Sequence, residues 1–229
     1  MALARTIVIE PQVLLLDEPL SNLDKALRVQ MRRELLDLQR RLGLTTIFVT
    51  HDQEEAMSTA DRMAVLDQGV VQQVGAPMAL YDDPANAFVA GFVGTTNVLP
   101  GRVTKRGDRS VTLRIDGVGD VEVPASGSAA ASAGGTAPAD AAATRMSAAF
   151  RPHSFRVEPP GAARDPRCAW MDGTVEESEF LGESTRYRVR VGPHSLAVDQ
   201  SHTAGMSKFP VGAAVSLGLD PTQVRLFAS

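Results

Sequence analysis

Residues 13–19, Val-Leu-Leu-Leu-Asp-Glu-Pro, decide the fold, because a short apolar run ends there in two adjacent carboxylates, Asp17 and Glu18. A run of this kind lacks the alternation of a half-exposed strand, which predicts a central strand of a parallel sheet with helices over both faces. Asp17 and Glu18 then lie at its C-terminal edge, where open α/β sheets bind ligands and where two acids suit Mg²⁺ and water chemistry. A buried strand that merely ends in acids is the other interpretation.

A second strand with a polar end follows one helix later. Residues 45–50 (TTIFVT) are β-branched and apolar, and His51 comes directly after them. Because a right-handed crossover brings consecutive parallel strands near each other, we expect His51 at the same sheet edge as the two acids. A lone histidine is more often structural than functional, but this position favours a functional one.

The helix between these strands is predicted from Asp24, its expected N-cap, to Gly43, its expected end. Its leucines and methionine recur at helical spacing. Several arginines lie among them, and they are interpreted as the solvated face of an amphipathic helix rather than as a binding patch. These arginines are Arg28, Arg32, Arg33, Arg40 and Arg41.

The remainder of the first part holds short elements. A helix is expected at residues 53–60, a β-hairpin at 62–74 with its turn at Gln68-Gly69, and short helical turns at 78–81 and 86–92. These elements make only half of an α/β domain, with too few strands for a complete sheet of this type. The exposed apolar faces of such a half predict self-association or aggregation.

From residue 97 the pattern changes to short strands separated by Gly, Pro and Asp, which predicts a small β-barrel or sandwich. Residues 125–148 are rich in Ala, Gly and Ser and are predicted to be a mobile loop. The expected strands are 98–103, 110–115, 121–123, 149–157, 168–176, 185–191, 195–198, 214–219 and 224–227.

Composition excludes several classes of protein. The formal net charge of -4 and the sequence pI of about 5.6 argue against a general nucleic-acid binder, which needs a basic face. The single cysteine, Cys168, excludes an internal disulfide framework. No run reaches the roughly 18 apolar residues of a membrane-spanning helix, so another subunit would have to provide any membrane part.

The motifs together carry a resemblance. Residues 14–19 (LLLDEP), 21–24 (SNLD) and 50–52 (THD) resemble the Walker B, D-loop and H-loop of the ATPase subunits of ABC transporters. Further segments look like the importer branch, whose subunits serve sugars, polyamines, ferric iron and phosphonates, and like the TOBE domain that such subunits carry. The importer-like segments are 53–56 (QEEA), 61–74 (DRMAVLDQGVVQQV), 75–77 (GAP), 81–84 (YDDP) and 92–97 (FVGTTN). The TOBE-like segment is 151–153 (RPH).

The resemblance implies a fold in two domains. Residues 1–96 would be the C-terminal part of an α/β P-loop NTPase nucleotide-binding domain with a parallel sheet. Residues 97–229 would be a small all-β, OB-like TOBE barrel. It also implies roles: Asp17 would help to hold Mg²⁺ through water, Glu18 would polarise the water that attacks the γ-phosphate of ATP, and His51 would contact that phosphate. Ser21 and Asp24 would lie at the nucleotide, in the segment that meets the opposite subunit.

The implied partners are transmembrane permease subunits of an importer, a second copy of the ATPase subunit in a homodimer and, indirectly, a periplasmic solute-binding protein; no nucleic acid is implied. The implied location is the cytoplasmic face of the inner membrane, as a peripheral subunit. The transported solute is set by the other subunits, so this chain does not reveal it.

The sequence also departs from the family. It contains no G-x-x-x-x-G-K-[ST] phosphate loop, no glutamine loop and no LSGGQ signature, and residues 1–5 (MALAR) resemble the segment just after that signature. Without the phosphate loop there is neither a backbone cradle nor a lysine for the β- and γ-phosphates. We therefore expect this polypeptide alone neither to bind ATP tightly nor to hydrolyse it.

Two other interpretations stay open. The chain could be a non-enzymatic regulatory or dimerisation module whose barrel binds a partner or a small anion through Arg151, His153, Arg186 and Arg188, although ordinary surface charge also explains these residues. A metal site at the histidines is disfavoured because His51, His153, His194 and His202 show no ligand spacing.

Overall fold

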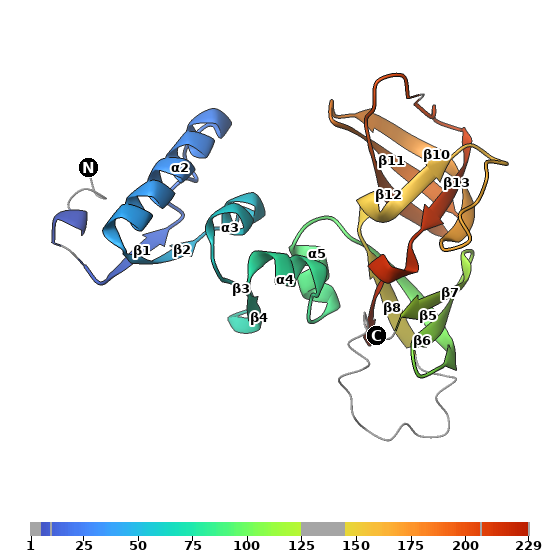
Figure 1. Ribbon diagram of the computed structural model, residues 1–229, viewed down its shortest axis with the longest axis horizontal. Coiled ribbons are helices and arrows are strands. Elements are labelled where there is room, and N and C mark those ends of the chain that lie inside the picture. The colour runs from blue at the N-terminus through green and yellow to red at the C-terminus, as the bar shows by residue number, and fades with distance from the viewer. Residues whose placement is uncertain (1–5, 10, 125–144, 207, 229) are drawn as a thin grey trace. The chain divides into compact units, whose positions relative to one another are not determined.

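The computed structural model of the chain (Figure 1) describes residues 6–9, 11–124, 145–206 and 208–228. The chain forms two compact units, Met1–Asp82 and Asp83–Ser229. The units divide before residues 86–92, whereas the domain boundary expected from the sequence falls after residue 96; that assignment of domains stays a prediction. Of the loop predicted at 125–148, residues 125–144 lie outside the described part of the chain.

The first unit is built on two parallel strands joined by a helix. β1 (Val13–Asp17) pairs with β2 (Thr45–Val49) in the register Val13↔Thr45 to Asp17↔Val49, and α2 (Lys25–Leu42) connects them. The elements that follow are α3 (Gln53–Thr59), β3 (Met63–Asp67), β4 (Val70–Gly75) and α4 (Pro77–Asp82). β3 and β4 form the expected hairpin, with positive φ angles of 48° at Gln68 and 81° at Gly69 in its turn.

Capping fixes both ends of α2 where the sequence predicts them. The Asp24 side chain accepts hydrogen bonds from the backbone N–H groups of Ala26 and Leu27, at 3.1 and 3.0 Å. Gly43 ends the helix with a left-handed φ of 64°, which a residue without a Cβ adopts at little cost. The helix that connects β1 to β2 therefore begins and ends at defined residues.

The expectation that the first strand is covered on both faces is wrong. Leu14 is 5% exposed, but Leu15 is 70% exposed and its register partner Ile47 is 53% exposed. The face that carries Leu14 turns toward α2, and the two line a cavity of about 720 Å³. On the opposite face, Val13, Leu15, Ile47 and Val49 stay exposed because the described residues supply no helix to cover them. We call these four residues the open sheet face.

The second unit consists of α5 (Ala87–Phe92) and two five-stranded antiparallel sheets (Figure 1). One sheet has the order β14-β8-β5-β6-β7, and the other has the order β12-β11-β10-β13-β9. In chain order the strands are β5 (Asn97–Arg106), β6 (Ser110–Ile115), β7 (Gly119–Pro124), β8 (Arg145–Phe150), β9 (Phe155–Glu158), β10 (Ala169–Phe180), β11 (Ser184–Val191), β12 (His194–Ser201), β13 (Ala214–Leu219) and β14 (Arg225–Ala228).

Both sheets bury one face in a shared core. β11 shows the alternation most clearly, since Tyr187, Val189 and Val191 are buried while the arginines between them point outward. The core cluster includes Leu113 and Val123 from one sheet together with residues of the other. The β-rich fold expected from residue 97 onward is thereby confirmed.

Two strand predictions in this unit need correction. The strand expected at 149–157 is two strands, β8 and β9, which belong to different sheets and are separated by the 3₁₀ turn η4 (Pro152–Ser154). Pro152 lacks the N–H that a continuing ladder needs, so the chain changes sheets there. Residues 145–148, predicted as part of the loop, belong to β8, in which Met146 and Ala148 are buried.

Asn97 ties the two sheets together at the start of β5. Its side-chain amide donates to the carbonyl oxygen of Ala197 in β12 at 2.8 Å, and its carbonyl oxygen accepts from the Ala197 N–H at 2.8 Å. A buried amide that satisfies both groups of one residue replaces the pair of hydrogen bonds that a neighbouring strand would make. β12, the edge strand of its sheet, is thus hydrogen-bonded to β5 of the other sheet.

Candidate functional site

The candidate site lies at the C-terminal edge of the β1–β2 sheet, where the backbone turns sharply. Glu18, the residue after β1, has a left-handed φ of 44°, which is uncommon for a residue other than glycine. Its N–H donates to the carbonyl oxygen of Val49 at 2.8 Å, which extends the parallel pairing by one residue. This bond holds the Glu18 backbone beside the end of β2, where residues 50–52 begin.

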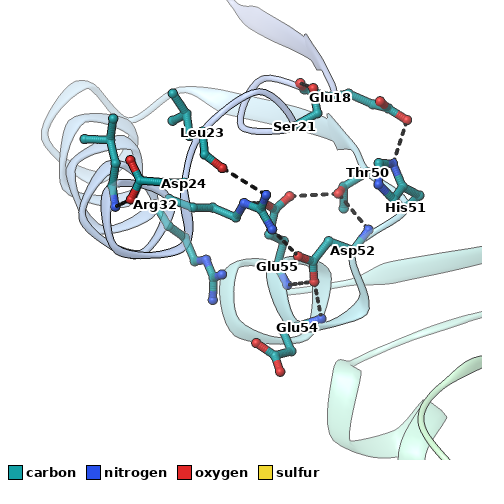
Figure 2. Close-up of polar contacts among 12 residues, drawn as sticks. Glu18, Ser21, Leu23, Asp24, Arg32, Thr50, His51, Asp52, Glu54 and Glu55 are labelled. Carbon is teal, nitrogen blue, oxygen red and sulfur yellow. Dashed lines mark hydrogen bonds and ion pairs between the residues drawn. The ribbon is translucent and has the colours of Figure 1, made fainter.

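Figure 2 shows the Glu18 and His51 side chains pointing toward one another. His51 Nδ1 lies 2.9 Å from Glu18 Oε1. The pKa of His51 is raised above its ordinary value, chiefly by this hydrogen bond, then by the charge of Glu18 and, less strongly, by those of Asp52 and Glu55. His51 therefore lies at the same sheet edge as the acids, as the topology predicts. Its catalytic role stays a prediction.

Ser21 and Asp24 form the turn that leads from Glu18 into α2. Ser21 donates to the carbonyl oxygen of Glu18 through its hydroxyl at 3.0 Å and through its N–H at 3.3 Å. Asp24 caps α2, so its Oδ1 is engaged with helix N–H groups. Both residues are exposed, and their assignment to nucleotide binding stays a prediction.

Asp17 closes β1 with an exposed carboxylate. Among the residues that the structure describes, no side chain is bonded to it. Mg²⁺ in phosphate-transfer sites is held by one or two carboxylates, water and substrate phosphates rather than by a protein cage. A single free carboxylate at this edge fits that requirement. Within the described parts of the chain no group of three or more His, Cys, Asp or Glu side chains could hold a metal ion by itself.

No role in the site was predicted for three residues named only among the helix arginines or within longer segments: Arg28, Thr50 and Glu55. Glu55 is 2% exposed, and it accepts a hydrogen bond from the Thr50 hydroxyl at 2.7 Å. Arg28 lies against Glu55 and forms an ion pair with Asp52 at 3.2 Å. The interpretation of Arg28 as part of a solvated face is therefore wrong.

A signal for Arg28 was present in the sequence. Arg28 precedes Met31 by three positions and Leu35 by seven, which places it on the apolar side of the helix. Arg32 also contacts α3, since its Nη1 donates to the Ser58 hydroxyl at 2.8 Å. The arginine run of α2 thus divides into residues that bind α3 and residues such as Arg33 that stay exposed.

The arginines suggested for an anion site in the barrel are already engaged. Arg186 pairs with Asp199 at 2.8 Å, and Arg188 pairs with Glu177 at 3.4 Å. Arg151 is 8% exposed, and its Nη1 lies against the carbonyl oxygens of Ala90, Gly94 and Thr95 and the Thr96 hydroxyl. Each of these three arginines is therefore engaged within the fold.

The comparisons with known proteins define first a domain. Residues 148–227 match the family model of the TOBE domain. A solved structure of the cytoplasmic molybdate-binding protein ModG matches 58% of this chain and 96% of its own, with a TM-score of 0.46 and 16% identity. At that level the structural likeness carries no argument. No helix in the described residues is long and apolar enough to cross a membrane.

The relatives in sequence are import ATP-binding proteins. The maltose/maltodextrin import ATP-binding protein MalK of Yersinia pestis bv. Antiqua (strain Antiqua) is 39% identical over 99% of this chain. The spermidine/putrescine import ATP-binding protein PotA of Rubrobacter xylanophilus is 44% identical over 96% of it. Over nearly its whole length the chain is similar in sequence to ATP-binding subunits of importers. It spans about half the length of the curated relatives it matches, 57% and 54% for these two.

Proposed function

We propose that this chain supplies the catalytic sheet edge of an ATP-hydrolysing subunit that drives solute import. The observation that carries the proposal is the contact between Glu18 and His51, at 2.9 Å, with Asp17 one residue before Glu18 at the end of β1. In this proposal Asp17 holds Mg²⁺ through water, Glu18 polarises the attacking water and His51 contacts the γ-phosphate. Mg²⁺, when bound, supplies positive charge against the phosphate oxygens.

The chain's own residues prepare this edge. The Glu18 backbone is fixed by its bond to Val49, so the carboxylate projects from a defined point next to β2. Glu18 holds the imidazole of His51 at Nδ1, which leaves Nε2 on the other side of the ring for a phosphate oxygen. Ser21 keeps the turn after Glu18 closed. Each of these contacts orients a group before any substrate arrives, which is the main source of rate in phosphoryl transfer.

Nucleotide binding belongs to the complete subunit in this proposal. The 229 residues contain no phosphate loop, and we expect calorimetry on this chain to give no ATP affinity in the micromolar range or better. In the cell the complete subunit pairs with a second copy and docks peripherally on permease subunits at the cytoplasmic face of the membrane. A periplasmic binding protein supplies the permease with solute. The imported solute is chosen by those partners.

A hybrid protein tests the catalytic assignment. In this hybrid, the part of the Yersinia pestis maltose/maltodextrin relative that lies outside the match is joined to the 229 residues of this chain. The ATPase rate of the hybrid is measured with saturating Mg²⁺ and ATP. We expect the hybrid to hydrolyse ATP, and we expect Glu18→Gln and His51→Ala each to lower kcat by about 100-fold or more, the range for loss of a general base or an electrostatic contact.

Glu54→Gln is the matched control, because Glu54 is an exposed carboxylate of α3 close in sequence to His51. It removes one negative charge without touching the sheet edge, and its rate is expected to stay within about twofold of the unsubstituted hybrid. An active hybrid that keeps its rate with Glu18→Gln would remove Glu18 from the chemistry.

The geometry does not favour the alternative of an anion-binding regulatory barrel. Arg151, Arg186 and Arg188 are bonded to carbonyl or carboxylate oxygens of the same unit. A new anion would have to displace those partners, which costs the interactions already made. A structural role of the second unit is therefore the better assignment.

A further inference from the structure

We infer that Arg28 is a positioning residue that couples residues 21–24 to His51. The inference rests on the proposed function for its catalytic meaning, because residues 21–24 are proposed to meet the second subunit and His51 is proposed to contact the phosphate. Its structural basis is independent of nucleotide: one guanidinium group of α2 binds both the turn that precedes the helix and the segment that carries His51.

The guanidinium makes three contacts in three directions. Arg28 Nη2 donates to the carbonyl oxygen of Leu23 at 3.1 Å, within residues 21–24. Nη1 donates to Asp52 Oδ2 at 3.2 Å, and Nε lies 3.6 Å from Glu55 Oε1. A planar guanidinium with fixed donor directions sets the relative orientation of the groups that it binds, which an ammonium group on a flexible stem does less well.

The contacts continue from these acids to both neighbours of His51. Glu55 Oε2 accepts a hydrogen bond from the Thr50 hydroxyl at 2.7 Å, and the same hydroxyl accepts from the Asp52 N–H at 3.0 Å. Asp52 also caps α3 by accepting from the N–H groups of Glu54 and Glu55, at 2.9 and 3.2 Å. Figure 2 shows this set of groups between Leu23 on one side and His51 on the other.

Burial makes this arrangement depend on Arg28. Glu55 is 2% exposed, and a carboxylate at such a depth is costly unless a cation and hydrogen-bond donors satisfy it. Without Arg28, Glu55 and Asp52 lose this cation, and we expect their carboxylates to turn toward water. That movement would pull on Thr50 and Asp52, the residues on either side of His51.

His51 itself has little else to hold it. Its side chain is 74% exposed and is bonded to Glu18. The orientation of the imidazole toward Glu18 is therefore set by the backbone of residues 50–52, which is fixed through Thr50 and Asp52. A displacement of residues 21–24 by a second subunit would reach His51 through Leu23, Arg28 and these two residues.

The test uses the 229-residue chain without nucleotide and reads the imidazole directly. The ¹⁵N and ¹H resonances of the His51 ring report the bond of Nδ1 to Glu18, with Glu18→Gln as the reference for its loss. We expect Arg28→Met to move these resonances toward those of Glu18→Gln and Arg28→Lys to restore them in part. Arg33→Met, an exposed arginine of the same helix, is expected to leave them unchanged.

A second variant keeps the test valid if Arg28→Met does not fold. Thr50→Val leaves the ion pairs of Arg28 in place and removes only the hydroxyl that links Glu55 to the backbone beside His51. It is expected to shift the His51 resonances in the same direction. If Arg28→Met and Thr50→Val lower stability but leave the His51 resonances unchanged, Arg28 serves only the packing of α2 on α3 and the inference is overturned.

The catalytic meaning is read separately in the hybrid ATPase. There Arg28→Met is expected to lower kcat about 10-fold to 100-fold while leaving KM nearly unchanged, because a misplaced group near the reacting atoms affects chemistry more than binding. An inactive hybrid would contradict the proposed function but not the coupling seen by NMR. Unchanged kcat together with shifted His51 resonances would contradict the catalytic meaning of the coupling alone.

Discussion

Glu18 combines an unusual backbone angle with the contact on which the proposed chemistry depends. Glycine would adopt a φ of 44° at less cost, so a contact of the Glu18 side chain must offset the conformational cost at this position. The carboxylate does so by meeting His51, whereas the backbone N–H, which glycine would also supply, extends the pairing of β1 with β2. An uncommon backbone angle and the contact with His51 thus occur in the same residue.

At the scale of single residues, we predict a raised pKa for His51. The bond to Glu18 raises it above 6.5, so the stabilisation from this pair is fully present below pH 6.5 and is lost as the pH rises through the higher pKa of the folded state. An NMR titration of the His51 ring should give a midpoint above 6.5, and Glu18→Gln should lower it. Glu54→Gln should change it less, and a midpoint at or below 6.5 in the unsubstituted chain would contradict the contact.

Sequence reasoning found Glu18 and His51 but not the residues that hold them. Acids and a histidine at the ends of successive apolar runs follow from strand order alone. Thr50 and Glu55 escaped notice because their bond depends on how α3 folds back beside β2, which is a tertiary arrangement. Arg28 was hidden among arginines that share its chemistry, and only its spacing to Met31 and Leu35 distinguishes it.

At the scale of elements, two turns of the second unit touch through glycines. Gly117, in the β6–β7 turn, and Gly192, in the β11–β12 turn, have positive φ angles of 77° and 54°. A Cβ on Gly117 would lie 2.6 Å from Pro193 Cδ, and one on Gly192 would lie 2.7 Å from the Gly117 Cα. The two turns can approach at this end because neither Gly117 nor Gly192 carries a Cβ.

Gly117→Ala tests this contact. We expect it to lower the free energy of unfolding by about 1–3 kcal/mol more than a glycine substitution without a steric conflict. Gly161→Ala is the matched control, since Gly161 has a nearly equal φ of 82° and open space around the added methyl group. Urea unfolding followed by fluorescence of the single tryptophan, Trp170, gives both values. Equal losses in the two variants would show that only backbone strain is involved.

The order of the strands was predictable in part and their assignment to sheets was not. Period-two alternation identifies strands such as β11, whose inward and outward residues differ strongly in polarity. The split of β8 from β9 depends on Pro152 and on pairing with strands distant in sequence. The small side chains of β8 looked like a loop because alanine contributes little to a hydrophobic pattern.

At the scale of the whole molecule, the open sheet face is an exposed apolar surface of the β1–β2 sheet. Leu15 and Ile47 pair in register on it, at 70% and 53% exposure. Contiguous apolar surface of this kind promotes association in solution. The sequence predicted association from the small number of strands, although it placed the first strand under two covering layers.

Leu15→Gln should therefore weaken self-association of the 229-residue chain. Burying a leucine in each of two copies contributes about 1.5–3 kcal/mol per side chain, so the dissociation constant should rise by at least about tenfold. Sedimentation equilibrium measures this, with Val211→Gln, an equally exposed apolar residue of the second unit, as the control. A chain that is monomeric before substitution would contradict the role of the open sheet face.

Arg151 has a consequence for how such chains can be recombined in evolution. It holds the carbonyl oxygens of Ala90, Gly94 and Thr95, and Ala90 packs against Ala149 and Phe227, so α5 is a part of the β-rich unit although it precedes the first strand. A crossover between genes at residues 96 and 97 would separate the arginine from acceptors shaped for it. Exchange between Asp82 and Asp83 would carry both together, and descendants joined there are the ones expected to fold without further change.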